Sequence, residues 1–576
     1  MTIKNSFSNL QPKLIHNNIH INMPKIPFWI FIIIAIVYFT GVRVDTMDVD
    51  ASQYAEISRE MMKSGDYLHL YDRGLDYLDK PPFLFWVSAT SMKLFGTTNF
   101  GYKLPSILAA LWAIFATYKL ATRLYDKKTG KIAALVLATC QGLFLWTNDI
   151  RCDTMLMCWV TTAIWLIQEW IENKKIHYLL LGCSAIALGM MTKGPLALMV
   201  PVFCFMSNWI LKREWKNFLR IEYLLGILII ALLLIPMSIG LYNQFDLHPE
   251  KLVNGHTNTS GLRFFYWSQS FGRITGESPW KNGADISFLM LNMLWSFLPW
   301  IFIFIIALIT NSIRLVKQKF LLQKEQEWIS TGGFLLTYLC LGMSAYQLPH
   351  YILVVFPLAA IITAVYIKEL IDGKIPIKLS NFLKYFQATI MLLLLFAMNL
   401  LIQFAFPASP VVVFAGVIST LIWLFIIFYK KFNTKLVWLS ASGMILINIF
   451  LTNQVYFSLL KYQIGNQLGT FVKENIVKKK MLANEIITYK MHDPMNAFPF
   501  YTDVIIDNTD TITYIANKKY VITMDDGLQE LEKHGYKHAT IFQGSCFKVS
   551  ELTPEFLYPK TRHKEVRNYY LVAISK

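Results

Sequence analysis

The stretch FWIFIIIAIVYFTGVRVDTMDVD (Phe28–Asp50) joins an apolar run to a cluster of carboxylates. The run FWIFIIIAIVYFTGV is uncharged and lacks a small-residue cleavage site, so it predicts a retained membrane anchor and not a cleaved signal peptide. Asp45, Asp48 and Asp50 follow it closely. A cluster of carboxylates is unusual beside a membrane span. The stretch therefore predicts a membrane protein with a candidate site at the mouth of its first helix.

The composition also indicates many membrane spans. Hydrophobic residues make up 55% of the 576 residues and charged residues 16%, and the mean hydropathy is +0.41. The net charge of +17 does not indicate nucleic-acid binding, because the basic residues gather in short loops between apolar runs, the positive-inside pattern. Seven cysteines are scattered without zinc-like spacing, so we expect neither a zinc site nor a disulfide framework.

Apolar runs recur through residues 27–456 and predict a polytopic α-helical membrane domain. The run at 83–95 is too short to span a bilayer, which leaves about thirteen transmembrane helices. Loops such as 123–131, 212–220 and 314–324 are rich in Lys and Arg and are predicted to be cytoplasmic.

Three further segments complete the predicted topology. The N-terminal segment 1–26 is expected in the cytoplasm, and long loops at 43–82 and 243–285 on the other side of a bacterial inner membrane. An odd number of spans places residues 457–576 outside the cytoplasm as well. The runs YVITM, ATIFQG and YYLVAI predict strands in this tail, and DDGLQELEKHG predicts a helix, so we expect a small α/β soluble domain.

The residues after Asp50 predict an amphipathic helix at the membrane interface. Asp50 itself has a purely structural interpretation, because Gln53 stands three residues on as in a capping box. Asp153 has the same interpretation at the start of another predicted span, and Lys80, before two prolines, is otherwise a snorkelling interface lysine. Two acids and a lysine at one membrane level nevertheless form a plausible site.

Several motifs, taken in order, resemble one family. They are DASQYAEISREMMKSGDYL, YLDKPPFLFWVSATSMKLFG, FGYKLPSILAAL, TKGPLALMVP, FYWSQSFGRITGE and YQLPHYILVVFP. The chain resembles bacterial C-type-fold glycosyltransferases that use polyprenyl-phosphate sugar donors, such as the aminoarabinose transferases that modify lipid A and, more distantly, the protein O-mannosyltransferases. The resemblance covers most of the membrane domain and implies the C-type glycosyltransferase fold.

The resemblance also implies roles for individual residues. Asp50 matches the family's catalytic aspartate and Asp153 a second outer acid. Lys80 and Arg273 match residues that meet the donor's phosphate, and Tyr351 matches the tyrosine of a Leu-Pro-x-Tyr corner on the same phosphate-binding side.

Further matches and departures concern the substrates. Tyr54, Glu56 and Ser270 are candidate substrate contacts. Many aminoarabinose transferases have His at the position of Ser270 and a basic residue at that of Gln347, which suggests a different sugar or acceptor. Relatives often have Asp-Glu where this chain has Asp50 followed by Ala, which weakens any metal site; no metal ligand is assigned, and a divalent cation is left open as cofactor.

These residues fit a direct displacement. Lys80 and Arg273 suit a phosphate leaving group, and Asp50 suits a general base that activates an acceptor hydroxyl, with inversion at the sugar carbon. We therefore expect a membrane glycosyltransferase that acts on a lipid, glycan or protein acceptor outside the cytoplasm. The alternative is a multi-span transporter or flippase, for which charged residues near the bilayer midplane are typical.

Overall fold

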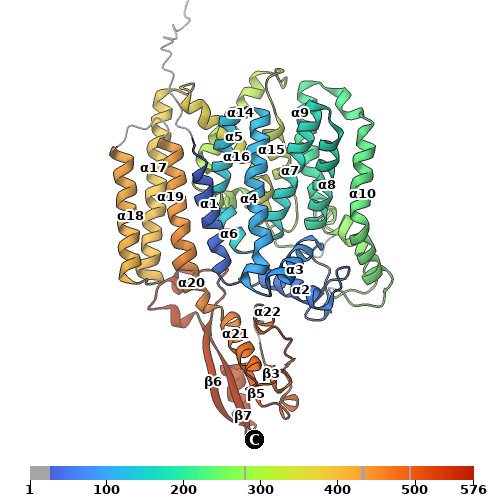
Figure 1. Ribbon diagram of the computed structural model, residues 1–576, viewed down its shortest axis with the longest axis vertical. Coiled ribbons are helices and arrows are strands. Elements are labelled where there is room, and N and C mark those ends of the chain that lie inside the picture. Colours follow the sequence, from blue (N-terminus) through green and yellow to red (C-terminus); the bar gives the residue numbers. More distant parts are fainter. Residues whose placement is uncertain (1–25, 254, 278–279, 430–434, 492–494) are drawn as a thin grey trace, which may run out of the picture.

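The computed structural model describes residues 26–253, 255–277, 280–429, 435–491 and 495–576. It consists of a bundle of long helices with a smaller domain of helices and strands at one end (Figure 1). The predicted cytoplasmic segment 1–26 lies outside the described residues, apart from Ile26.

The helices of the bundle follow the apolar runs. In the described part of the chain, eight helices are long and apolar enough to cross a membrane, or nine when one bent pair is counted. The bundle helices are α1 (Trp29–Thr40), α4 (Asn99–Leu124), α5 (Lys127–Ala138), α6 (Gln141–Asn148), α7 (Cys152–Asn173), α8 (Ile176–Lys193), α9 (Leu196–Lys212), α10 (Glu222–Leu241), α13 (Phe288–Ser296), α14 (Ile301–Lys317), α15 (Ile329–Gly342), α16 (Phe356–Ile371), α17 (Ile377–Leu400), α18 (Pro410–Tyr429) and α19 (Lys435–Phe450). The predicted polytopic helical fold is confirmed, and the predicted number of about thirteen spans included shorter apolar helices such as α1, α9 and α15.

Two runs predicted as single helices are divided. The run at 131–147 is divided into α5 and α6, with a bend of 52° between the two helices. At the break, the Gln141 amide donates a hydrogen bond to the carbonyl of Leu298. Gly142 allows the close approach, because a Cβ there would lie 2.8 Å from the Cβ of Ser296. The run at 286–310 becomes α13 and α14, with Pro299, which lacks an amide hydrogen, in the gap.

The first long loop forms a compact layer at the end of the bundle that carries the smaller domain (Figure 1). It contains α2 (Asp50–Ser64) and the antiparallel strands β1 (Tyr71–Asp72) and β2 (Leu75–Asp76), and α3 (Phe83–Phe95) follows it and packs against α2. Helix α2 is the amphipathic helix expected after Asp50, but part of its polar face is buried. Glu56 and Arg59 on that face are 1% and 2% exposed, since the C-terminal domain covers them.

The C-terminal domain is the predicted α/β module. The helical segment that includes α19 continues to Tyr462, and the first helix of the module, α21, follows it. Its sheet has the order β4-β3-β5-β7-β6, with β3 parallel to β4 and β5, and β7 antiparallel to β5 and β6. The elements are α21 (Ile464–Val477), β3 (Ile486–Tyr489), α22 (Phe498–Thr502), β4 (Asn508–Thr509), β5 (Tyr520–Met524), α23 (Asp525–Lys533), β6 (Lys537–Cys546) and β7 (Arg567–Ser575).

Candidate functional site

Arg273 and Tyr351 form the centre of a pocket at the end of the bundle nearest the C-terminal domain. Arg273 lies on the short helix α12 (Phe271–Thr275) and Tyr351 on the 3-10 helix η5 (Pro349–Val355); Lys193 and Ser270 line the same pocket. Arg273 Nη1 donates to the Tyr351 hydroxyl at 2.9 Å. Arg273 Nε is buried and has no hydrogen-bond partner among the described residues. A buried guanidinium donor without a partner suits an anionic ligand.

Lys80 lies in the loop before α3 and is paired with its neighbour. Its ammonium is 2.6 Å from the Asp79 carboxylate, and Gln269 donates to the Asp79 carbonyl. Burial alone would lower the pKa of Lys80, but the charge and hydrogen bond of Asp79 together with the nearby Tyr351 more than offset burial and raise it. For Asp79 the two influences have the opposite signs. Burial raises the pKa of Asp79, but the charges of Lys80 and Arg273 more than offset burial, so the pKa of Asp79 lies below its usual value. Lys80 is therefore a fixed cation.

Asp153 forms a buried ion pair and does not cap its helix. One carboxylate oxygen lies 2.5 Å from Lys193 Nζ, and the other lies 3.6 Å from His350 Nε2. The Asp153 side chain is 3% exposed. Lys193 Nζ also lies 3.7 Å from the centre of the Tyr351 ring, a cation–π contact, so Tyr351 contacts two cations of the pocket. The capping interpretation of Asp153 is not supported, because α7 has no side-chain cap hydrogen bond.

Asp50 is also free of the capping role. Helix α2 begins at Asp50 and has no side-chain cap hydrogen bond; Gln53 donates to Asp72 instead. Asp50 Oδ2 accepts a hydrogen bond from Arg151 Nη1, and Arg151 Nη2 is 2.7 Å from the Asp149 carboxylate. The Asp50 side chain is 33% exposed, and the structure records no hydrogen bond from a described residue to Asp50 Oδ1. Asp50 is thus held through one oxygen.

Lys103, in the motif FGYKLPSILAAL, joins the two segments that carry Asp50 and Arg151. Its buried ammonium donates to the carbonyl oxygens of Val44 at 2.8 Å, Asp45 at 3.3 Å and Asn148 at 3.2 Å. Val44 follows the first membrane helix, and Asn148 is the last residue of α6. A cation is favoured at helix C-terminal carbonyls, so Lys103 fixes the separation of these two loops.

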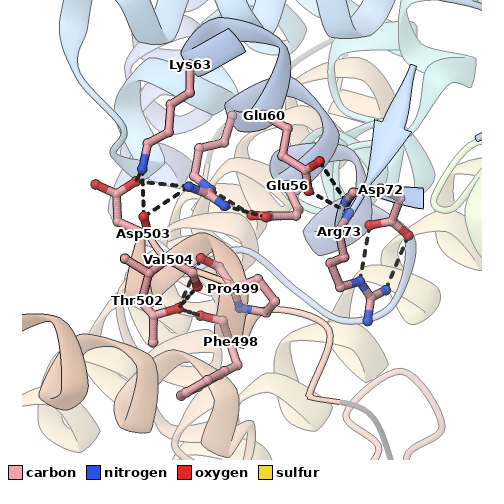
Figure 2. A network of polar contacts seen from close by, with 12 residues as sticks. Glu56, Glu60, Lys63, Asp72, Arg73, Phe498, Pro499, Thr502, Asp503 and Val504 are labelled. Atoms are coloured by element: carbon pink, nitrogen blue, oxygen red, sulfur yellow. Dashed lines mark hydrogen bonds and ion pairs between the residues drawn. The ribbon is translucent and has the colours of Figure 1, made fainter. Parts of the chain in front are cut away.

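The three candidate substrate contacts lie in different places. Ser270 lines the pocket with Arg273. Tyr54 is buried and packs edge-on against Phe85 at 5.7 Å. Glu56 points away toward the C-terminal domain, where it pairs with Arg59 at 2.5 Å; a substrate contact for Glu56 is not supported. Figure 2 shows Glu56 in this domain junction.

Other expectations concerned Gln347 and a metal. Gln347 is buried and donates to the carbonyls of Asp285, Gly342 and Ser344. It therefore stabilises a turn, at the position where the resemblance led us to expect a basic side chain. Within the described residues, no three His, Cys, Asp or Glu side chains are grouped as metal ligands.

Sequence reasoning missed Lys103, Arg151 and Lys193. Each lies within a motif or loop that the sequence made noticeable: FGYKLPS, TNDIRCD and TKGP. The available signal was a cation beside an outer acid or at a span end, but its partner depends on long-range packing.

Comparisons with known proteins agree with this picture. The family described as dolichyl-phosphate-mannose-protein mannosyltransferase matches residues 79–239. The undecaprenyl phosphate-alpha-4-amino-4-deoxy-L-arabinose arabinosyl transferase of Edwardsiella ictaluri is 27% identical over 327 residues, 56% of this chain and 55% of that protein. An uncharacterized protein of Aquifex aeolicus is 23% identical over 459 residues, 79% of this chain and 82% of its own. The chain thus spans about half the length of the Edwardsiella relative.

A solved structure confirms the fold. ArnT from Cupriavidus metallidurans, crystallised with undecaprenyl phosphate, matches with a TM-score of 0.70 and 16% identity over 94% of this chain and 97% of that one. The fold is therefore the C-type glycosyltransferase fold with a C-terminal α/β domain, as the motifs implied. The bacterial relatives and the apolar helices fit a multi-pass protein of the bacterial inner membrane.

Proposed function

We propose that this protein is a membrane glycosyltransferase that moves a sugar from a polyprenyl-phosphate donor to an acceptor outside the cytoplasm. The observation that carries the proposal is the pocket with Lys193, Arg273 and Tyr351 on its wall, in which Arg273 Nε lacks a partner among the described residues. A phosphate oxygen is the ligand that this buried donor suits. The similarity to transferases whose names include undecaprenyl phosphate supports the same donor class.

The reaction is a direct displacement. The acceptor hydroxyl oxygen forms a bond to the sugar's anomeric carbon, while the bond from that carbon to the phosphate oxygen breaks and its electron pair leaves with the phosphate. Arg273 and Lys80 stabilise the charge that develops on the phosphate. Asp50 Oδ1 takes the proton from the acceptor hydroxyl, and Arg151 holds the carboxylate through Oδ2. A single displacement inverts the sugar carbon.

Asp153 takes a different role in this proposal from the catalytic one that the resemblance implied. A carboxylate that is 3% exposed and 2.5 Å from a lysine ammonium is poorly placed to meet an acceptor. We assign Asp153 to holding Lys193 in place against the Tyr351 ring. Lys193 joins Lys80 and Arg273 as a third cation near the phosphate.

We also propose that the C-terminal domain and the first long loop lie outside the cytoplasm. The loops rich in Lys and Arg lie at the other end of the bundle. Contacts near them include the ion pairs Lys368–Asp126 and Arg314–Glu369 and a hydrogen bond from the Tyr125 hydroxyl to the Glu327 carboxylate. Such loops are retained in the cytoplasm. Labelling of single cysteines in intact cells with an impermeant reagent tests this. Protection of a cysteine in the C-terminal domain, in cells where a loop at 212–220 is labelled, would reverse the orientation.

The rival proposal, a transporter or flippase, is less well supported. The candidate charges are concentrated at the end of the bundle covered by the C-terminal domain, whereas transport sites lie near the bilayer midplane.

The deciding experiment uses purified protein in lipid nanodiscs with polyprenyl-phosphate donors that carry radiolabelled sugars and with extracted envelope lipids, glycans and proteins. We expect the label on one acceptor class and an equal amount of free polyprenyl phosphate. Donor that crosses the bilayer of a proteoliposome intact, without cleavage, would favour the transporter.

A further inference from the structure

The backbone just before Asp50 is held by side chains of the C-terminal domain. Gln463, which precedes α21, accepts a hydrogen bond from the Asp48 amide through Oε1 at 2.8 Å and donates to the Thr46 carbonyl through Nε2 at 2.8 Å. The side chain of Gln463 is buried, and Asn466 Oδ1 accepts from the same Nε2 at 2.6 Å. One amide therefore satisfies two backbone groups, as a paired strand would.

Tyr501, near the end of α22, binds the other side of Thr46. Its hydroxyl accepts from the Thr46 amide at 2.8 Å and donates to Asn99 Oδ1 at 2.7 Å. Asn99 in turn donates to Asp45 Oδ1 at 2.9 Å. Both backbone polar groups of Thr46, four residues before Asp50, thus depend on the C-terminal domain.

The far end of α2 is also held by this domain. Arg59 and Lys63 bind Asp503, which follows α22: Arg59 Nη1 lies 3.3 Å and Lys63 Nζ 2.6 Å from the same carboxylate oxygen. Figure 2 shows Lys63 reaching Asp503 across the junction. The C-terminal domain therefore contacts α2 at both ends: it binds the backbone just before the first turn and the side chains of Arg59 and Lys63 in the last turns.

We propose that the C-terminal domain is a positioning part of the active site, in which Gln463 and Tyr501 set the place of Asp50. The proposal rests on the proposed function, with Asp50 as base. A base must lie within hydrogen-bond reach of the proton that it takes, and a displacement of about 1 Å costs roughly a hundredfold in rate. Arg151 binds only one carboxylate oxygen of Asp50. Gln463 and Tyr501 instead bind the backbone that precedes Asp50.

The first test compares turnover by the whole protein with variants at two junctions. Gln463→Leu and Tyr501→Phe remove contacts to the loop. Arg562→Gln is the control, because Arg562 joins the same domain to the bundle at the carbonyl of Ala405, away from the loop. We expect kcat to fall at least about tenfold in both loop variants with the KM for donor changed less than about threefold, and the control to retain at least a third of wild-type kcat.

A second measurement separates positioning from mere attachment of the domain. A protonated carboxyl can replace the amide of Gln463, because it offers one donor and one acceptor, whereas a carboxylate only accepts. The ratio of Gln463→Glu to wild-type turnover should therefore rise as pH falls from 8 to about 5.5. A ratio that does not change with pH, or equal losses in Gln463→Leu and Arg562→Gln, would overturn the proposal.

Hydrogen exchange keeps this test independent of activity. In Gln463→Leu the amide of Asp48, and in Tyr501→Phe the amide of Thr46, should exchange at least about tenfold faster than in the wild type, while those of α16 stay unchanged. Unchanged exchange at Thr46 and Asp48 would overturn the proposal even if turnover falls. A wild-type protein that cleaves no polyprenyl-phosphate sugar would instead refute the proposed function, and the exchange result would still report on the contact.

Discussion

The two sides of the candidate site differ in charge and in how they are held. The donor side has three cations, Lys80, Lys193 and Arg273, against the two carboxylates Asp79 and Asp153. The base side has two carboxylates, Asp50 and Asp149, which share Arg151. The formal excess is positive where a phosphate would leave and negative where a proton would be taken. The site thus separates the two charges that a displacement generates.

The two acids implied to be catalytic show the same contrast. Asp153 is buried and satisfied by Lys193, whereas Asp50 is one-third exposed and holds Arg151 through one oxygen. Two aspartates at the start of their helices therefore have different chemistry, because Asp153 pairs with a lysine from α8 in the interior, whereas Asp50 pairs with Arg151 and stays one-third exposed. Four predictions test this contrast, from the largest expected effect to the smallest.

Breaking the buried pair should cost the most. Lys193→Met leaves the Asp153 carboxylate buried without its ammonium, and removing one partner of a buried pair costs about 3–5 kcal/mol. Thermal unfolding in detergent measures the loss. The double variant Lys193→Met with Asp153→Leu should recover most of it, because no charge is then stranded. A double variant as unstable as the single one would mean that the pair is not the source of the stability.

Loss of Arg273 should have the next largest effect. Arg273→Met removes the guanidinium from the leaving phosphate, and loss of one such donor lowers kcat about 10²–10³-fold. Arg263→Met is the matched control, since its side chain is 72% exposed in the same outer loop. Steady-state transfer measures both. If the two variants turn over equally fast, the phosphate does not meet Arg273.

Loss of Lys80 should cost less, because Asp79 already neutralises it. A charge-assisted hydrogen bond contributes about 1.5–3 kcal/mol, so Lys80→Met should weaken donor binding roughly 10–100-fold. Lys80→Arg should restore only part of it, because the planar guanidinium has a different geometry. Donor titration by isothermal calorimetry gives the affinities. Wild-type affinity in Lys80→Met would remove Lys80 from the donor side.

The smallest effect concerns Glu60, on helix α2 beside the amides of Arg73 and Gly74. Burial raises the pKa of Glu60 to about 7, although the amides of Arg73 and Gly74 oppose the rise. The pKa of an unfolded Glu is about 4.3, so Glu60 favours the folded state fully below that pH, and this contribution is lost as pH rises toward 7. Glu60→Gln should flatten the dependence of unfolding temperature on pH in this window. Glu474→Gln, at an exposed side chain of α21, should not.

Much of the fold was predictable because it depends on local patterns. Apolar runs located the helices of the bundle, and alternating β-branched and aromatic residues located β5, β6 and β7. The short strands β3 and β4 and the break between α5 and α6 were missed. That break is stabilised by a contact from Gln141 to Leu298, 157 residues away, which no local pattern carries.

The sequence predicted several residues of the candidate site, but not which of them contact one another. Motifs indicated Arg273 and Tyr351, and the structure joins them by a hydrogen bond. They also indicated Asp153, but its burial against Lys193 depends on the packing of α7 on α8. The burial of part of the polar face of α2 could not be predicted for the same reason, since the domain that buries Arg59 lies more than 400 residues further along the chain.

The most direct test of the central claim is single-turnover sugar transfer by Asp50→Asn. Asparagine fills the same space and can still contact Arg151, but it cannot accept a proton. The partly exposed ion pair adds only about 0–1 kcal/mol, so the variant should unfold near the wild-type temperature and bind donor normally. General-base assistance contributes roughly 10²–10⁴-fold, and we predict transfer slower by at least about a hundredfold. Transfer by Asp50→Asn at close to the wild-type rate would contradict the account and leave the base elsewhere.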